Sequence, residues 1–379
     1  MENKHRIAML LSIFALTAGM FTFLHLVQNG TFDIMTYAQA KELEQKETAA
    51  SSDAGAYFAE AEDDDSDGLE FSFHLSGGIG KDDVEVSINQ MSQTLMIDID
   101  GADDNYVTAN PLSGASTHIN DLLLYSYDDG YGYEITLDDY YECETAVEDG
   151  EFKISLVDPH EKYDYIVVID PGHGGSDSPG TVWNGVKESD ITLEIGNAIM
   201  KYQEQLAEMG IGLYTTRTED VYTYLSGRCA MANGLDADLF LSIHCNSIPG
   251  YWDDATSGVE TLYSQKDKKG NSKALAQLLS EKVAESTSSR DRGAVMGDEI
   301  YIIRKAKVPV ALCEVGFMSN HTELSNLQTK SYRKKVAEGF YNTIIYAFEN
   351  GLDAEEAKAD STVDNSATED IVNNENDEN

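Results

Sequence analysis

Apolar and polar positions alternate along much of the first half of the chain. An apolar side chain occupies every second position in the runs 69–75, 84–88, 95–99, 133–137 and 152–156. A period of two is typical of half-buried β-strands, and the Gly, Asn and Asp residues between the runs are those that turns prefer. The pattern predicts a small all-β domain over residues 69–160, built as a sandwich or a β-roll.

The pattern changes over residues 161–351, where short apolar strands alternate with longer helical segments. Residues 165–169 and 239–243 are continuous apolar runs, as in strands that are buried on both faces. Further strands are predicted at 213–216, 258–263, 300–303 and 308–312, and helices over 191–206, 271–284 and 336–344. This alternation predicts an α/β fold, with a central, mostly parallel or mixed sheet and helices on both of its faces.

The first thirty residues resemble a targeting segment. A basic start at residues 4–6 precedes an apolar run over 7–27, which has 21 residues and no Asp, Glu, Lys or Arg. About 20 apolar residues suffice to span a bilayer as a helix, and the preceding positive charge places the N-terminus in the cytoplasm. The small-residue pattern at 38–40 supports a cleaved signal peptide instead. Segment 1–30 is therefore predicted to be a membrane anchor or a signal peptide, and both export the protein.

The chain is strongly acidic, with a formal net charge of −42. Such a charge repels nucleic-acid phosphate, which excludes nucleic acid as an expected partner. Residues 31–68 are predicted to be an acidic linker and residues 352–379 a disordered acidic tail. The four cysteines show no CxxC spacing, so they are expected to be isolated thiols rather than a disulfide framework.

Two histidines follow predicted buried strands. His173 lies in the loop Asp170-Pro171-Gly172-His173-Gly174-Gly175, directly after strand 165–169, and His244 follows strand 239–243. Sites in α/β sheets form beyond the carboxyl ends of strands, and glycine and proline force a sharp turn there. Each histidine alone also fits a structural role. Together they point to a shared metal ion.

Two glutamates extend this candidate site. Glu188 opens a predicted helix, where Ser189 or Asp190 is expected to be the N-cap. It is either a carboxylate that favours the helix dipole or the third ligand of a His₂Glu set, as in catalytic zinc sites. Glu314 follows the apolar strand 308–312, where a carboxylate is costly unless it is paired or functional. Its expected role is general base and acid, taking a proton from zinc-activated water and delivering it to a leaving nitrogen.

These segments resemble a known family of enzymes. The His173 loop, the Glu188 segment, Ser242-Ile243-His244-Cys245-Asn246 and the run 314–320 are similar to motifs of the zinc-dependent N-acetylmuramoyl-L-alanine amidases of the type 3 family. The resemblance covers roughly residues 164–350, with the motifs in the family's order and spacing. Further matches are Arg217, Gly258-Val259-Glu260, Arg292-Gly293 and Arg304, whereas Ser178-Pro179-Gly180 departs from the usual run.

The resemblance implies one zinc ion held by His173, Glu188 and His244, with Glu314 as the catalytic carboxylate. It also implies the reaction, hydrolysis of the amide between the lactyl group of N-acetylmuramic acid and L-alanine in peptidoglycan. The expected location is then outside the cell, at the membrane, in the wall or secreted. The β domain would bind the wall or regulate the enzyme. Its tyrosines either form a glycan-binding surface or pack at strand edges: Tyr125, Tyr127, Tyr131, Tyr133, Tyr140 and Tyr141.

Two other functions fit part of the pattern. A zinc peptidase acting on the stem peptides of peptidoglycan would use the same metal chemistry, and only the family resemblance separates it from an amidase. An inactive wall-binding or regulatory module would be expected to lack a ligand or the catalytic carboxylate, but all four residues are present. The sequence makes no prediction of the oligomeric state.

Overall fold

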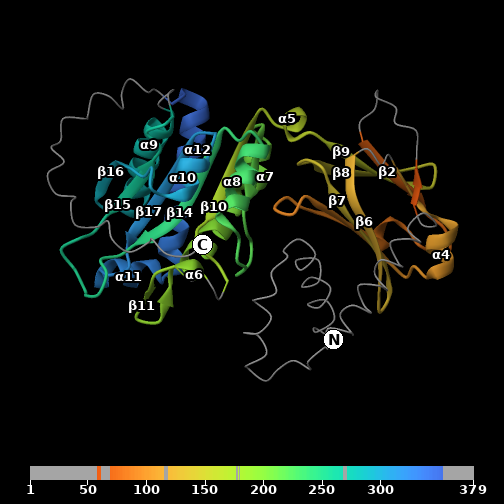
Figure 1. The fold of residues 1–379 in the computed structure, drawn as a ribbon, viewed down its shortest axis with the longest axis horizontal. Helices are drawn as coiled ribbons and strands as arrows, with labels where there is room; N and C mark the ends of the chain where they lie inside the picture. The colour runs from red at the N-terminus through yellow and green to blue at the C-terminus, as the bar shows by residue number, and fades with distance from the viewer. Residues whose placement is uncertain are drawn as a thin grey trace. The chain divides into compact units, whose positions relative to one another are not determined.

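The computed structural model of the 379-residue chain describes residues 58–60, 69–114, 118–175, 178, 180–267 and 271–352 (Figure 1). The predicted anchor or signal segment, most of the predicted acidic linker and nearly all of the predicted tail lie outside these residues. Within the described part of the chain, no helix is both long enough and apolar enough to cross a membrane.

The first half of the described chain forms two β-sheets around one core. One sheet has the order β1 (Phe58–Glu60), β5 (Leu112–Gly114), β2 (Leu69–His74), β9 (Glu151–Val157), β8 (Glu142–Glu148), and the other β3 (Val84–Asn89), β4 (Thr94–Asp100), β7 (Gly130–Leu137), β6 (Ile119–Tyr127). Inward side chains such as Phe71, Ile97 and Ile135 are fully buried in a shared core. The expectation of a small β domain is confirmed, with one turn-forming helix η3 (Lys81–Asp83) and one short helix α4 (Asp104–Ala109) added.

The second half of the chain is built on a six-stranded mixed sheet. Its order is β13 (Ile211–Thr215), β10 (Tyr165–Pro171), β14 (Leu239–Asn246), β17 (Val310–Phe317), β15 (Val259–Tyr263), β16 (Asp291–Met296). The first four strands run parallel to one another, β15 is antiparallel to β17, and β16 is parallel to β15. The central strands are buried on both faces, which explains their continuous apolar sequences.

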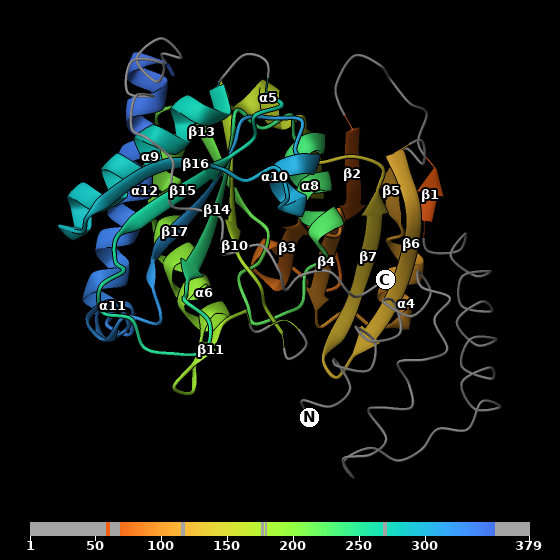
Figure 2. The ribbon, with the colours of Figure 1, turned by 60° about the vertical axis from the view of Figure 1, so that its left-hand side comes forward.

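Helices cover both faces of this sheet, as Figure 2 shows. Helices α6 (Glu188–Ile199), α9 (Asn271–Thr287) and α12 (Lys330–Asn350) contribute to the larger core, and α8 (Leu225–Gly234) and α10 (Tyr301–Lys305) to a second core on the other face. The predicted α/β architecture is confirmed. Shorter elements complete it: α5 (Pro159–Lys162), the hairpin β11 (Val182–Trp183) and β12 (Val186–Lys187), η5 (Met200–Tyr202), α7 (Gln203–Ala207) and α11 (His321–Leu327).

One predicted strand is wrong. Residues 300–303 were expected to be a strand, but Tyr301–Lys305 is helix α10. A run of four apolar residues has no period that separates a strand from a helix. The consecutive side chains Ile302 and Ile303 are both buried in the same core, which a helix allows and an alternating strand does not. Strand β16 was not predicted, because Asp291–Met296 contains Arg and Gly and does not alternate.

The topology gathers the candidate residues at one edge of the sheet. Strands β10, β14 and β17 are parallel, so their carboxyl ends meet at the same edge. The His173 loop follows β10, while His244 and Glu314 are register partners near the ends of β14 and β17. Helix α6 begins with Glu188 and packs against both β10 and β14.

Candidate active site

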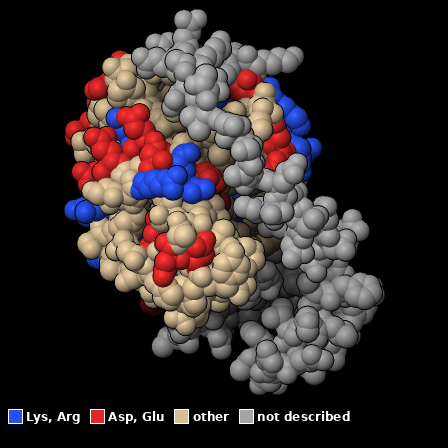
Figure 3. Space-filling view, turned by 90° about the vertical axis from the view of Figure 1, so that its left-hand side faces the viewer, with Lys and Arg blue, Asp and Glu red and all other residues tan. Residues whose placement is uncertain are grey.

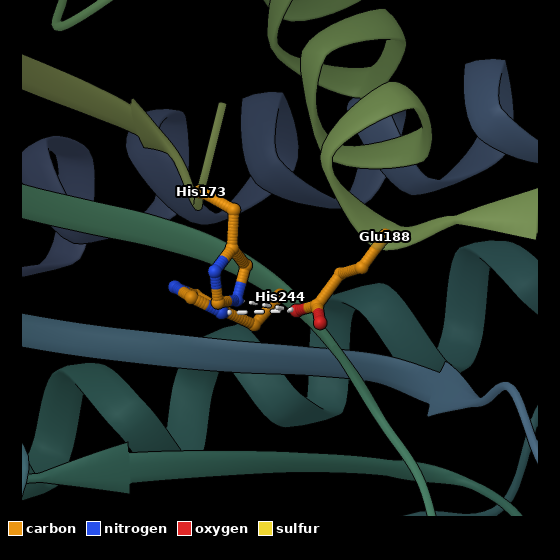
Figure 4. Close-up of side chains that lie close together, drawn as sticks. All are labelled: His173, Glu188 and His244. Atoms are coloured by element: carbon orange, nitrogen blue, oxygen red, sulfur yellow. Dashed lines mark hydrogen bonds and ion pairs between the residues drawn. The ribbon is translucent and has the colours of Figure 1, made fainter. Parts of the chain in front are cut away.

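Three side chains converge beyond the sheet edge, as Figure 4 shows. The atoms His173 Nε2 and His244 Nδ1 lie 3.2 Å and 3.0 Å from the same carboxylate oxygen, Glu188 Oε1. The two imidazole rings are nearly perpendicular, with centroids 4.7 Å apart. One ligand atom from each of the three residues lies within 4.8 Å of the others. The structure therefore brings the three predicted ligands together.

The Glu188 carboxylate is fixed by backbone groups as well as by the histidines. The Thr181 N–H donates to Oε2 at 2.8 Å, and the Cys245 N–H donates to Oε1 at 2.9 Å. Burial raises the pKa of Glu188, but the contacts with the two histidines outweigh it and hold the pKa below its ordinary range. Burial also lowers the pKa of His244. An ionised carboxylate and a neutral imidazole are the forms that bind metal.

Helix α6 begins two or three residues earlier than expected. The structure places the N-cap at Lys187, without a side-chain cap, rather than at Ser189 or Asp190. Glu188 therefore occupies the first helical position. Its carboxylate accepts hydrogen bonds from N–H groups outside the helix. These contacts, and not a side-chain cap, hold the first turn of the helix in place.

Two glycines leave room for the converging side chains. A Cβ at Gly172 would lie 2.3 Å from His244 Nε2, and a Cβ at Gly180 would lie 2.6 Å from Glu188 Oε2 and from His173 Cδ2. His173 itself has a left-handed φ of 59°, which is uncommon outside glycine. Two nitrogen donors and one carboxylate held in this way match the donor set of a three-ligand zinc site.

Two buried arginines hold the backbone of the His173 loop. Arg217 donates to the carbonyls of Pro171 and Gly172, each at 2.8 Å. Arg228 donates to the carbonyls of Pro171 at 2.8 Å and His173 at 2.6 Å. These bonds pair the backbone carbonyls of a loop that turns sharply, and they fix the direction in which the His173 side chain leaves the loop.

A buried carboxylate balances these arginines. Asp170 accepts hydrogen bonds from Arg228 at 2.5 Å, Thr216 at 2.6 Å and Ser242 at 2.8 Å. Burial raises the pKa of Asp170, but the Arg228 charge and the two hydroxyls hold it below its ordinary range. Burial lowers the pKa of Arg217 to about 10. Sequence reasoning missed this supporting network; the signal was a carboxylate directly after a buried strand.

Glu314 lies on β17 beside His244 rather than within the three-residue cluster. The two residues are register partners on adjacent strands, which in sheets lie about 4.8 Å apart. The Oε2 atom of Glu314 is sealed from solvent and has no hydrogen-bond partner among the described residues. Burial raises the pKa of Glu314 well above its ordinary range, and the charges of Glu188 and Glu260 raise it further. A carboxyl with a raised pKa holds a proton more readily than an ordinary glutamate does, which suits a group that accepts and then donates one.

A second charged pair lies across from Glu314. Glu260 is its register partner on β15 and is paired with Arg292, whose Nε lies 3.0 Å from Glu260 Oε2. The Arg292 guanidinium also lies 5.1 Å from the centre of the Phe317 ring. Arg292 thus neutralises one of the two neighbouring carboxylates, whereas Glu314 has no ion pair within the described part of the chain.

The other residues near the site have structural roles. Glu323 accepts the N–H groups of Phe317 at 2.7 Å and Gly258 at 2.8 Å, which joins the end of β17 to the start of β15. Cys245 and Cys313 are free thiols whose side chains lie in the larger hydrophobic core, on the opposite face from their site neighbours.

Comparisons with known proteins match the part of the chain that carries this site. The family model described as N-acetylmuramoyl-L-alanine amidase matches residues 167–346. The uncharacterized protein YqiI of Bacillus subtilis is 37% identical over 47% of this chain and 82% of its own length. The sporulation-specific N-acetylmuramoyl-L-alanine amidase of the same organism is 34% identical over 48% of this chain and 68% of its own length.

One solved structure, of N-acetylmuramoyl-L-alanine amidase from Clostridium difficile 630, aligns with a TM-score of 0.45 at 29% identity, over 49% of this chain and 97% of that chain. The sequence matches over residues 167–346 show that the chain belongs to the type 3 N-acetylmuramoyl-L-alanine amidase family.

Proposed function

We propose that this protein is a peptidoglycan amidase that hydrolyses the bond between the lactyl group of N-acetylmuramic acid and L-alanine. The observation that carries the proposal is the convergence of His173, Glu188 and His244 beside Glu314, in a chain of the amidase family. The named amidases among its relatives support the choice of bond.

His173, Glu188 and His244 would hold one zinc ion. When bound there, the ion supplies a Lewis acid that polarises the amide carbonyl and makes water more acidic. The chain's own residues prepare the site. The Thr181 and Cys245 N–H groups fix Glu188, and Gly172 and Gly180 leave space for the imidazole rings.

Glu314 would be the general base and then the general acid. It accepts a proton from the attacking water and passes one to the nitrogen of L-alanine as the C–N bond breaks. The products are a lactyl carboxylate on the sugar and a peptide with a free N-terminus. A carboxyl with a raised pKa suits both halves of this exchange.

Peptidoglycan lies outside the cytoplasm, so we propose that the protein acts there. The segment 7–27, predicted to direct export, lies outside the described residues. The domain limits near residue 160 and a wall-binding or regulatory role for the β domain also stay predictions.

Mass spectrometry of digested peptidoglycan tests the bond. The expected products are peptides that begin with L-alanine and glycan strands with free lactyl groups. Cleavage within the stem peptide would instead establish a peptidase, and absence of any cleavage by the zinc-loaded protein would refute the amidase function.

A Glu314→Gln variant tests the mechanism. Loss of the proton-transfer group should lower kcat by at least about 100-fold, in the range typical of general acid–base catalysis, while zinc content is retained. Glu349→Gln, on the exposed end of α12, is the matched control and should keep full activity. Native activity in Glu314→Gln would remove this residue from the mechanism.

A further inference from the structure

Exposed large apolar side chains gather around the candidate active site. The described residues include 13 such side chains, and seven of them lie in three short segments, 182–183, 221–225 and 251–252. The rest are scattered over separate elements. Exposed apolar side chains that cluster in this way are more often part of a binding site than singly exposed ones are.

Hydrogen bonds tie all three segments to the site. Segment 182–183 follows Thr181, whose N–H holds Glu188 and whose hydroxyl lies 3.2 Å from Ser247 Oγ. Segment 251–252 continues the loop that begins at Ser247. On the other flank, Asp220 accepts the N–H of Gly175 in the His173 loop at 2.8 Å, next to segment 221–225. Two residues span at most about 7 Å of chain, so Trp183 lies close to the metal cluster.

The tryptophans of two of these segments are packed against each other. The Trp183 and Trp252 rings meet at 80° with centroids 5.4 Å apart, and 39% of Trp252 is exposed. One face of Trp252 is covered by the His321 ring, which stacks on it at 3.8 Å. Although His321 and Trp183 both pack against this indole, more than a third of the residue stays exposed.

The support behind Trp252 is rigid. His321 Nδ1 lies 3.0 Å from Asp254 Oδ1, and the His321 N–H donates to the same atom at 2.9 Å. The loop is also held by the Asp253 N–H, which donates to the Ser319 carbonyl at 2.9 Å. An aromatic ring that is fixed before its ligand arrives loses little entropy on binding.

The charge beside the indole selects between the two parts of peptidoglycan. Asp253 and Asp254 flank Trp252, and hydrogen bonds from Thr256 and His321, respectively, lower the pKa of each, so both are ionised. They repel the carboxylates of a stem peptide. A neutral sugar ring, by contrast, presents C–H groups that pack on the negative face of an aromatic ring. Its hydroxyls can also donate hydrogen bonds to the two carboxylates.

We propose that Trp252, with Trp183, forms a saccharide subsite that stacks a sugar ring of the glycan strand next to the muramic acid at the candidate active site. The inference rests on the proposed amidase function for its substrate, but its geometry is independent of catalysis. It makes the enzyme selective for peptides that are still attached to a glycan chain.

Tryptophan fluorescence tests the binding directly, because the whole chain contains only two tryptophans and both belong to this subsite. The full-length wild-type protein is titrated with a peptide-free oligomer of N-acetylglucosamine, which has no lactyl amide to cut. A saturable change in emission is expected, and Trp252→Ala should weaken the affinity at least about tenfold. An unchanged spectrum at saturating sugar would overturn the proposal, whatever the enzyme's activity.

Kinetics provides a second readout. On glycan-bearing substrate, Trp252→Ala should raise KM about tenfold with little change in kcat, whereas on a single muramoyl peptide both constants should stay near the native values. Trp252→Phe should keep most of the native KM, which separates stacking from misfolding. Tyr346→Ala, a similarly exposed aromatic on α12, is the control.

Two outcomes would contradict these proposals in different ways. An equal loss of activity on both substrates would assign Trp252 a structural role. A wild type that cuts neither substrate would refute the amidase function, while the fluorescence result would still hold.

Discussion

At the scale of single residues, the site depends on charges that are buried in pairs. Arg228 is 2% exposed and Asp170 is 1% exposed, and their side chains meet directly below the His173 loop. Removing one member of a buried pair leaves an uncompensated charge, which is far more costly than losing a surface ion pair. The pair that holds the His173 loop is therefore expected to contribute to the stability of the fold, independently of any role of His173 in catalysis.

Arg228→Met should lower the free energy of unfolding by about 3–5 kcal/mol, because Asp170 would remain buried without its partner. Urea denaturation of the full chain measures this difference. Arg290→Met removes the same charge from an exposed position and should change stability by less than about 0.5 kcal/mol. Equal effects of the two variants would show that the pair is not important for folding.

Asp170 should also make stability depend on pH in the acid range. Its folded pKa is lowered, so its contribution is present above the ordinary value of 3.8 and is lost as the pH falls toward the folded value. Between about pH 4 and pH 2, the wild type should therefore lose more stability than Asp170→Asn, which cannot titrate. Parallel acid unfolding curves for the two proteins would contradict this assignment.

At the scale of elements, the turn after β10 sets the position of the imidazole rings. Gly172→Ala should displace His244, since the added Cβ would lie 2.3 Å from its Nε2 atom. Disturbed ligand orientation typically lowers metal affinity by about 10–100-fold, which competition with a chelator can measure. Gly80→Ala, in the β domain, would place its Cβ in ordinary contact with Asp83 Oδ2 at 3.8 Å and should leave zinc affinity unchanged.

Much of the fold could be predicted from such elements because their periods are clear. Strand β10 is a continuous apolar run, and β3 alternates strictly, so both were predicted. Helix α10 and strand β16 were not predicted. The helix is too short to show a period, and the strand forms through pairing with β15 rather than from a pattern in its own sequence. The three ligands were found because each ends or begins a strongly patterned element. The Asp170–Arg228 pair was not, since 58 residues separate its members and only the tertiary fold joins them.

At the scale of the whole molecule, the net charge of −42 does not describe every surface. Figure 3 shows a band of Lys and Arg side chains between groups of Asp and Glu on one face. The total charge therefore does not give the charge of each local surface.

Removal of zinc should destabilise the protein as a whole. Any ligand that binds only the folded state raises stability by mass action, and three residues from separate elements share this site. A strong chelator should therefore lower both Tm and activity, and added Zn²⁺ should restore both. An unchanged Tm in metal-free protein would mean that the three residues do not hold the ion tightly. His244→Ala should remove the dependence of Tm on zinc.

The position of β17 has a consequence for how the enzyme is made. This strand lies between β14 and β15 in the sheet, although both of them precede it in the chain. Synthesis proceeds from the N-terminus, so the three metal-site residues emerge from the ribosome at least seventy positions before Glu314. A nascent or prematurely terminated chain can carry the ligand triad but lacks the carboxylate beside it. Such a chain also lacks the strand that joins β14 to β15, so the sheet stays divided at the candidate site until β17 has been made.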